Sequence, residues 1–202
     1  DLAALYRSRP QNLLGTDVTF SGGLNLANMG TFIKYNEANE PLPMNIRLGP
    51  AVTFDFDEYN QLTIASDLNK VLARVEETCT TDADGEQECN LEATPFYESL
   101  FTGWGPVGGE QVTTEQGQQA SSLSLAEQFT VGVGLEYWYN QLFALRTGYF
   151  YEDPENGDRR FLTFGAGLRY NIVGIDISYI YSGRQNDPVA NTLRFSLLLS
   201  FQ

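Results

Sequence analysis

The chain has 202 residues, of which 26 are acidic and 12 are basic, and it carries a formal net charge of −14 at pH 7. This charge argues against nucleic acid as a partner, because contacts to phosphate need basic side chains. The sequence has no histidine, which excludes a Ser-His-Asp triad, a His-ligated metal and a histidine general base, and its apolar runs are too short for a transmembrane helix. Most kinds of hydrolase are therefore not expected, and no cofactor is predicted.

Nine segments are predicted to form β-strands, because apolar and polar side chains alternate along most of them. Their residue ranges are 1–7, 17–35, 46–56, 61–75, 127–139, 142–151, 160–170, 172–181 and 191–201. Segment 142–151 fits less well, since it puts Phe150 on the side of Arg146. Segment 61–75 loses its alternation after Ser66. The pattern as a whole predicts an antiparallel sheet with one apolar and one polar face.

The connections between these segments alternate between short and long. The short ones are 57–60, 140–141 and 171, and the long ones are 36–45, 76–126, 152–160 and 182–191. Bacterial outer-membrane barrels have short periplasmic turns and long extracellular loops, whereas a soluble sandwich has no reason to sort its connections by side. Aromatic residues flank both kinds of connection, as interfacial girdles do; they are Tyr59, Tyr137, Trp138, Tyr139 and Tyr170 at the short ones, and Tyr35, Tyr149, Phe150, Tyr151, Tyr179 and Tyr181 at the long ones. The sequence therefore predicts an all-β, transmembrane antiparallel β-barrel, with a half-buried sheet of a soluble protein as the alternative.

The front end of the chain is expected to continue upstream. The first segment opens as a strand caught part-way, and nine is an odd number, whereas single-chain bacterial barrels have even numbers of strands. An unpaired sheet edge would not be tolerated in lipid. We therefore expect residues 1–202 to be the C-terminal part of one outer-membrane β-barrel domain.

The long connection 76–126 is an acidic insert. No Lys or Arg lies between Arg74 and Arg146, and this stretch holds twelve acidic residues, Glu76, Glu77, Asp82, Asp84, Glu86, Glu88, Glu92, Glu98, Glu110, Glu115, Glu127 and Glu136. Two interpretations stay open: a solvated loop that aids solubility, or a docking surface for basic partners or divalent cations.

Cys79 and Cys89 are the only cysteines, and in an exported protein such a pair is most simply a disulfide that closes a small loop. In the chain-entropy model this closure contributes about 2.5 to 3 kcal/mol. Between them, residues 82–85 resemble the start of an EF-hand loop, but Ala93 stands where the twelfth-position glutamate is needed. No metal site is predicted.

The second half of the insert gathers apolar side chains outside any strand pattern. They are Phe96, Tyr97, Leu100, Phe101 and Trp104. Rings on a long extracellular loop must fold into the lumen, cover the rim or meet a partner, and contact with a partner and inward folding are both retained. The polar stretch 110–124 that follows is expected to be mobile.

Three stretches resemble the PorV family of outer-membrane shuttle proteins of the type IX secretion system of Bacteroidetes. They are GLNLANMGTFIKY at 23–35, PLPMNIRLGPAVTFDF at 41–56, and the closing run from Gly148 to Ser182. Members of that family are FadL-like barrels of fourteen strands, so the resemblance implies that about five strands precede this chain. One departure is that Gln202 follows Phe201, where such barrels usually end on an aromatic residue.

The resemblance implies a non-enzymatic role in the outer membrane. Such proteins collect secreted cargo with a C-terminal signal domain at a large outer-membrane translocon barrel and pass it to a cell-surface sortase complex. Their extracellular loops do this, which would place the Cys79–Cys89 hairpin and the Phe96–Trp104 cluster near a partner, while membrane lipid and lipopolysaccharide surround the barrel. The alternative is a FadL-type channel for uptake of hydrophobic compounds. Against a lipid path, the predicted lumen-facing residues are polar: Arg47, Asp55, Glu136, Arg146, Arg169, Asp176 and Arg194.

Overall fold

The structure is a computed structural model that describes residues 1–31, 33–35, 38–40, 42–81, 87–114, 117–183 and 191–200. The chain divides into two compact units. The first consists of Asp1–Ala3, Asn25–Arg47 and Asn69–Phe129, and the second of Ala4–Leu24, Leu48–Leu68 and Thr130–Gln202.

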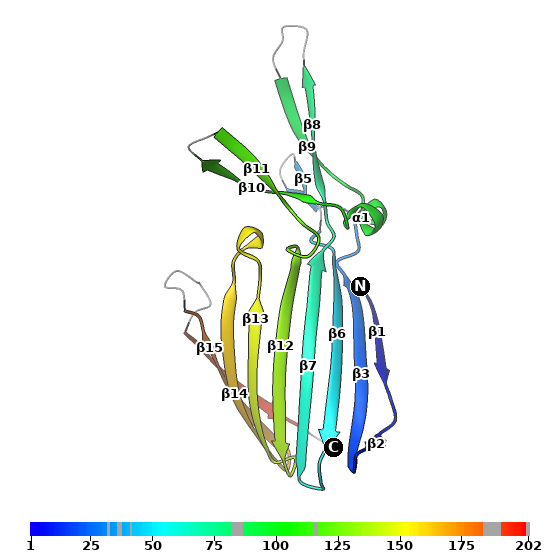
Figure 1. The fold of residues 1–202 in the computed structure, drawn as a ribbon, viewed down its shortest axis with the longest axis vertical. Coiled ribbons are helices and arrows are strands. Elements are labelled where there is room, and N and C mark those ends of the chain that lie inside the picture. Colours follow the sequence, from blue (N-terminus) through cyan, green and yellow to red (C-terminus); the bar gives the residue numbers. More distant parts are fainter. Residues whose placement is uncertain are drawn as a thin grey trace. The chain divides into compact units, whose positions relative to one another are not determined.

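Among the described residues, ten strands form one sheet in the order β1-β3-β6-β7-β12-β13-β14-β15-β16, with β2 paired to β3 (Figure 1). Their bounds are β1 Leu2–Arg7, β2 Gln11–Leu13, β3 Thr16–Ala27, β6 Asn45–Asp55, β7 Asn60–Val71, β12 Phe129–Tyr139, β13 Phe143–Tyr151, β14 Arg160–Tyr170, β15 Val173–Tyr181 and β16 Thr192–Leu199. Strands β12 to β16 pair antiparallel, each with the next. The predicted all-β antiparallel class is confirmed.

The remaining elements lie in the connections. Three two-stranded hairpins are formed by β4 Ile33–Tyr35 with β5 Ala38–Glu40, β8 Val75–Thr81 with β9 Gln87–Ala93, and β10 Val107–Thr114 with β11 Gly117–Leu123. The helices are α1 Phe96–Thr102 and the 3₁₀ turn η1 Pro154–Asn156. In the part of the chain that the structure describes, no helix has both the length and the apolar character needed to cross a membrane.

Two predicted strands are too long at their C-terminal ends. Strand β3 ends at Ala27 rather than at residue 35, because Asn28 has a left-handed φ of 58° and its N–H donates to the Asp1 carboxylate at 2.7 Å. Strand β7 ends at Val71 rather than at residue 75, since the N–H of Leu72 donates to the carbonyl of Met44 at 2.7 Å. Each strand ends where the backbone N–H of the next residue donates to an acceptor outside the strand ladder.

The described residues of the stretch 110–124, which was predicted to be mobile, contain regular structure. Strands β10 and β11 pair antiparallel there, with Thr114 opposite Gly117 at the tip and a register shift between Gly108 and Gln111. Backbone pairing between two strands needs little apolar content, and this is why hydropathy did not indicate these strands.

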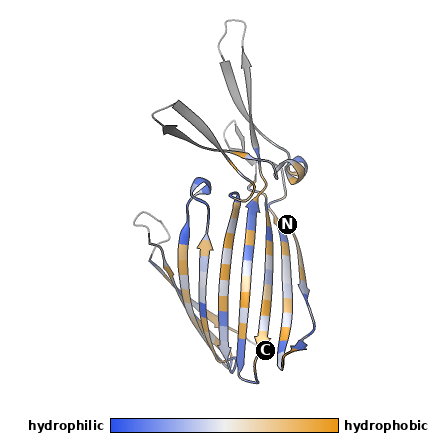
Figure 2. Ribbon diagram, in the orientation of Figure 1, coloured by the Kyte–Doolittle hydropathy of each residue, from blue (hydrophilic) through white to orange (hydrophobic). Residues whose placement is uncertain are grey.

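Hydrophobic and more hydrophilic residues alternate along the strands of the sheet (Figure 2). On β14 to β16 the apolar positions are exposed, and the exposed fraction reaches 68% at Phe195. The exposed set on these strands is Leu162, Phe164, Leu168, Tyr170, Val173, Ile175, Ile177, Tyr179, Tyr181, Leu193, Phe195, Leu197 and Leu199. An apolar face of this extent requires an apolar neighbour.

The predicted short connections are confirmed, and Figure 1 shows them at one end of the sheet. Asn140 and Gln141 both have a φ of 51°, and the N–H of Leu142 donates to the carbonyl of Tyr139 at 3.0 Å. This is the geometry of a type I′ turn, which matches the twist of a hairpin. Asn171 has a φ of 50°, a conformation that asparagine tolerates better than most residues.

The turn between β6 and β7 predicts a pH dependence of stability. The Asp57 carboxylate accepts hydrogen bonds from the N–H groups of Tyr59 and Asn60 at 2.8 Å, and from the Asn60 side-chain amide at 2.7 and 2.8 Å. The Asn60 side chain, followed by the Tyr59 N–H, lowers the pKa of Asp57 below its ordinary value of 3.8. The stabilising contribution is therefore present above that ordinary value and is lost as the pH falls through the lowered pKa.

Asp57→Asn is accordingly expected to unfold more easily than the wild type at neutral pH. The difference between the two unfolding midpoints should shrink as the pH falls below the ordinary value of 3.8 and vanish once it has passed through the lowered pKa. Urea unfolding of the detergent-solubilised protein over this range measures it, with Glu58→Gln as the control in the same turn. A difference that is independent of pH would contradict the role of the Asp57 charge.

Candidate protein-interaction site

Helix α1 exposes aromatic rings and buries a polar residue. Four of the five predicted partner-binding side chains, Phe96, Tyr97, Phe101 and Trp104, are exposed, with the exposed fraction reaching 57% at Tyr97 and 83% at Phe101. Leu100 is half-buried. We call these four exposed residues the α1 aromatic surface. An amphipathic helix normally buries its apolar side against the protein. The apolar side of this helix is instead exposed.

The rings of the α1 aromatic surface are held in place locally. Phe96 and Tyr97 meet edge to face with ring centroids 5.7 Å apart, and the indole N–H of Trp104 donates to the carbonyl of Leu100 at 2.8 Å. The edge-to-face arrangement is a favoured one for aromatic pairs. Local contacts therefore orient three of the four rings, those of Phe96, Tyr97 and Trp104.

The sequence around α1 explains where the helix begins and ends. Pro95 precedes it, and the carbonyl of Pro95 accepts from the N–H groups of Glu98 at 3.0 Å and Ser99 at 2.9 Å. Glu98 in the first turn interacts favourably with the helix dipole. Buried Ser99 donates its hydroxyl to the carbonyl of Thr94 at 3.3 Å, and its own carbonyl accepts from the N–H of Gly103 at 2.9 Å.

The side chain of Arg74 forms hydrogen bonds with the turn that follows α1. Its guanidinium donates to the carbonyl oxygens of Gly103 at 2.9 Å, Gly105 at 2.6 Å and Pro106 at 3.5 Å. Burial lowers the pKa of Arg74 below its ordinary value. Sequence reasoning missed this contact, although Arg74 is the last basic residue before the acidic stretch and could have been noticed for that reason.

Gln128 follows the C-terminal end of the insert, and its side chain forms a hydrogen bond with the same turn. Its side-chain N–H₂ donates to the carbonyls of Gly105 at 3.1 Å and Leu123 at 3.0 Å, while its oxygen accepts from the buried Lys70 ammonium at 2.5 Å. Residues on both sides of the insert thus converge on one turn. Nothing in the local sequence pattern indicates a contact of such long range.

The hairpin β8–β9 brings the two cysteines to opposite positions. In its register Cys79 pairs with Cys89, and residues directly opposite in antiparallel strands have Cα atoms about 4.5 to 5.5 Å apart. This spacing lies within the range that a disulfide spans. Asp82 to Glu86, with the EF-hand-like start, lie outside the described residues. Within the described ranges, no group of three or more His, Cys, Asp or Glu residues could hold a metal ion.

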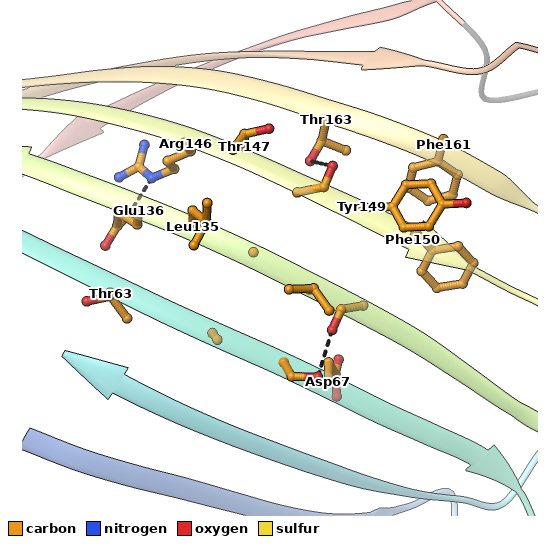
Figure 3. Close-up of a pocket in the computed structure, with 16 residues that line it drawn as sticks. Thr63, Asp67, Leu135, Glu136, Arg146, Thr147, Tyr149, Phe150, Phe161 and Thr163 are labelled. Carbon is orange, nitrogen blue, oxygen red and sulfur yellow. Dashed lines mark hydrogen bonds and ion pairs between the residues drawn. The ribbon is translucent and has the colours of Figure 1, made fainter.

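The polar face of the second unit carries a groove of about 520 Å³ over β7, β12, β13 and β14 (Figure 3). Gly132 and Gly134 contribute to its floor, and the stacked rings of Phe150 and Phe161, with centroids 4.7 Å apart, lie at one end. Arg146 lies at the other end. The misfit of Phe150 in the strand pattern is thereby explained, because this ring faces the groove.

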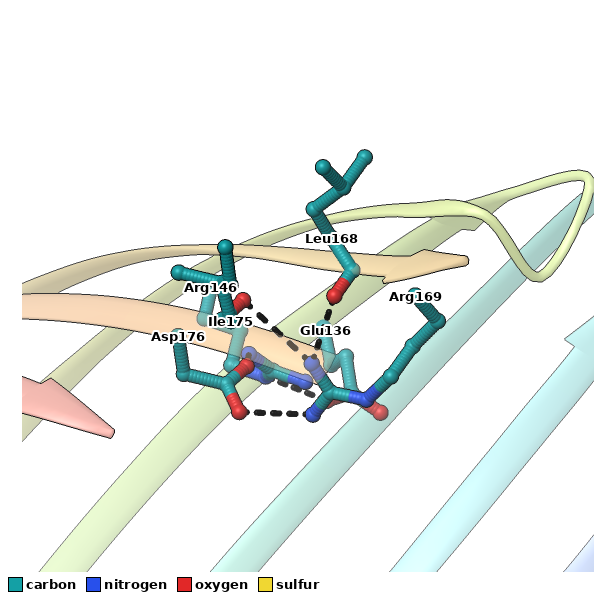
Figure 4. Close-up of polar contacts among 6 residues, drawn as sticks. All are labelled: Glu136, Arg146, Leu168, Arg169, Ile175 and Asp176. Atoms are coloured by element: carbon teal, nitrogen blue, oxygen red, sulfur yellow. Dashed lines mark hydrogen bonds and ion pairs between the residues drawn. The ribbon is translucent and has the colours of Figure 1, made fainter. Parts of the chain in front are cut away.

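Four predicted lumen-facing residues form one charged network (Figure 4). Arg146 contacts Glu136 at 2.5 Å and Asp176 at 2.8 Å, and Arg169 contacts the second oxygen of Asp176 at 2.6 Å. Both guanidinium groups lie over the ring of Trp138, at 5.4 and 5.7 Å from its centroid. The carboxylates of Glu136 and Asp176 therefore form ion pairs with the two arginines.

Trp138 corrects a sequence prediction. It was expected to belong to an interfacial aromatic girdle beside a short connection, but its cation–π contacts place it on the polar face with Glu136, two residues away on the same strand. Of the other predicted lumen residues, Asp55 accepts from the Gln61 amide at 2.6 Å, and Arg194 lies opposite Ser178. Arg47 also has a polar partner.

Residues 1–78 match the sequence model of the family described as type IX secretion system protein PorV. This segment is similar to the PorV family. The PorV resemblance seen in 23–35 and 41–56 is thus confirmed, because both stretches lie within the match. The match supports a component of the type IX secretion system and an association with the outer membrane. The curated proteins include no match to the chain.

The PorV match ends before the α1 aromatic surface, and of the groove it covers only the lining residues on β7. Their roles therefore have to be argued from their own geometry.

Proposed function

We propose that the chain is a non-enzymatic outer-membrane component of the type IX secretion system. It binds the C-terminal signal domains of secreted cargo at the translocon and shuttles the cargo to the cell-surface sortase complex. The observation that carries this proposal is the α1 aromatic surface: four exposed rings on the acidic insert of a chain whose first 78 residues match PorV.

The apolar face of the sheet supports the location in the membrane. Its exposed side chains alternate with polar ones along β14 to β16, as in a strand with lipid on one side. Membrane lipid and lipopolysaccharide are the proposed neighbours of this face. The short connections then belong to the periplasmic end and the insert to the extracellular side.

The composition of the insert supports a protein partner with basic groups around an apolar pocket. Aromatic residues are enriched in the cores of protein interfaces, and complementary charge at the rim speeds encounter. Glu98 is exposed on α1 beside Tyr97, and no Lys or Arg occurs between Arg74 and Arg146. The translocon barrel and the cargo domains are the proposed partners.

Photo-crosslinking tests the proposed partner directly. Phe101→p-benzoylphenylalanine in native cells is expected to give covalent adducts with a very large outer-membrane barrel or with exported proteins that share a C-terminal domain. The same probe at Leu14, which is fully exposed at a turn, is the matched control and should give neither adduct. Identical adducts at the two positions, or adducts with lipid alone, would contradict the proposal.

The Cys79–Cys89 pair is proposed as a disulfide that stabilises the β8–β9 hairpin. Cys79→Ser is then expected to make the insert more sensitive to added protease in intact cells, with cleavage between residues 75 and 93. The wild type treated with a reducing agent should match the variant. If digestion of the two proteins is unchanged, the cysteines are not bridged.

The groove favours a second candidate function, uptake of hydrophobic compounds. The stacked Phe150 and Phe161 give it an aromatic end of the kind that binds apolar ligands. Gly134→Leu would fill the groove, because the nearest atom to a Cβ at Gly134 is 3.8 Å away. Impaired growth of this variant on a hydrophobic nutrient, with secretion intact, would favour uptake.

A further inference from the structure

Helix α1 is too short to be stable by itself. It has seven residues, and isolated helices below about 12 to 15 residues are marginal in water. Its N-cap residue, Pro95, makes no side-chain capping hydrogen bond. Contacts outside the helix must therefore hold the α1 aromatic surface in place.

The end of the helix is pressed against the segment that leaves β7. A Cβ atom at Gly103 would lie 2.5 Å from the carbonyl oxygen of Ser99 and 2.8 Å from that of Leu72, so only glycine allows this approach. Leu72 has an exposed fraction of 0% and is itself tied to Met44 through its N–H. The C-terminal end of the helix thus packs on the buried segment around Leu72, which we call its base.

Arg74 is the group that joins the helix end to this base. One guanidinium nitrogen serves the carbonyls of both Gly103 and Gly105, and a second lies 3.5 Å from the carbonyl of Pro106. A planar guanidinium presents five donors in a fixed fork, whereas a lysine ammonium is a point charge on a flexible stem. A lysine could not reach these acceptors in the same way, since the three carbonyls belong to Gly103, Gly105 and Pro106.

The backbone of Arg74 adds a further tie. Its carbonyl accepts from the N–H of Thr94 at 3.0 Å, two residues before α1 begins. Arg74 therefore contacts the chain both before and after the helix. Removal of its side chain would free the C-terminal side and leave the N-terminal tie intact.

We propose that Arg74 is a positioning residue that keeps α1 preformed, so that the aromatic surface meets its partner already ordered. The proposal rests on the proposed function for its biological meaning, but the ordering of α1 can be measured without a partner. The apparent affinity of a surface is reduced in proportion to the fraction of molecules in which it is ordered. A preformed surface therefore binds its partner more tightly.

Hydrogen exchange of the purified full chain in detergent micelles measures the ordering. Arg74→Ala and Arg74→Lys are expected to speed amide exchange in 96–106 at least tenfold, with exchange in β13 and β14 unchanged. Added guanidinium, below denaturing concentrations, should slow exchange again in Arg74→Ala only. Arg9→Ala, which removes an exposed arginine at a turn, is the charge-matched control.

The partner readout uses the same photo-crosslinker at Phe101 in native outer membranes. The adduct yield of Arg74→Ala should fall by the factor by which protection falls. Tyr97→Ala should lower the yield without changing protection, because it removes a contact and leaves the anchor. If Arg74→Ala exchanges like the wild type, the positioning role is overturned. If protection falls but the wild type gives no protein adduct, the positioning role stands and the proposed function fails.

Gly103→Ala is the second variant, in case Arg74→Ala does not insert. It keeps every charge but forces the helix end away from Leu72, and it should also raise exchange in 96–106 at least tenfold. Unchanged exchange in this variant would contradict the close packing of the helix end on its base.

Discussion

Replacement of Phe96, Phe101 and Trp104 with serine is expected to stop secretion while the sheet still inserts. Aromatic residues at the centre of an interface commonly contribute about 2 kcal/mol or more each when truncated, which is roughly a thirtyfold change in affinity per ring. The three rings are exposed, so their removal leaves no cavity. Exported proteins with the shared C-terminal domain should therefore accumulate in the periplasm, as measured by fractionation and mass spectrometry.

The control for this variant is Leu14→Ser, which removes an exposed apolar side chain from a turn of the second unit. It should leave secretion unchanged. Heat modifiability on gels reports whether each variant is inserted and folded. Normal secretion by the triple variant at normal insertion would mean that α1 is not the docking element.

Gly167→Val is expected to lower the free energy of unfolding by about 2 kcal/mol. A Cβ at this position would lie 2.6 Å from Asp176 Oδ1 and 2.8 Å from Arg146 Nη1, so the bond between these two side chains would have to break. A hydrogen bond between charged groups contributes about 1.5 to 3 kcal/mol, and we take a value inside this range because the network is partly exposed.

Urea unfolding in detergent measures the change, and Gly134→Ala is the matched control. The nearest atom to a Cβ at Gly134 is a carbonyl oxygen at 3.8 Å, which is an ordinary contact, so this variant should be neutral. Asp176→Asn should reproduce most of the loss, because it removes the charge that both arginines share. Equal stability of Gly167→Val and the wild type would show that the network contributes nothing measurable.

Side-chain alternation predicted the sheet because it is a local property of each strand. The face on which Leu193, Phe195 and Leu197 lie follows from a period of two, and the register between β15 and β16 preserves it. The same rule indicated that Arg146, Arg169 and Asp176 would share a face. Their direct contacts depend on cross-strand register, which alternation alone does not give.

The base of α1 could not be predicted from the sequence. Arg74 contacts carbonyls about thirty residues away, and carbonyl acceptors leave no trace in side-chain pattern. The role of Gln128 could not be predicted either, because the sequence does not distinguish a buried glutamine from an exposed polar loop residue. The exposed rings of α1 were noticed only because they interrupt a polar insert.

Loss of the whole protein tests the secretion role most directly. In cells that lack it, exported proteins with the shared C-terminal domain should be found in the periplasm instead of on the surface, and the wild-type chain in its full-length form should restore their export. Growth on hydrophobic nutrients should be unaffected. Normal export together with impaired uptake of such nutrients would contradict the secretion role and establish the channel instead.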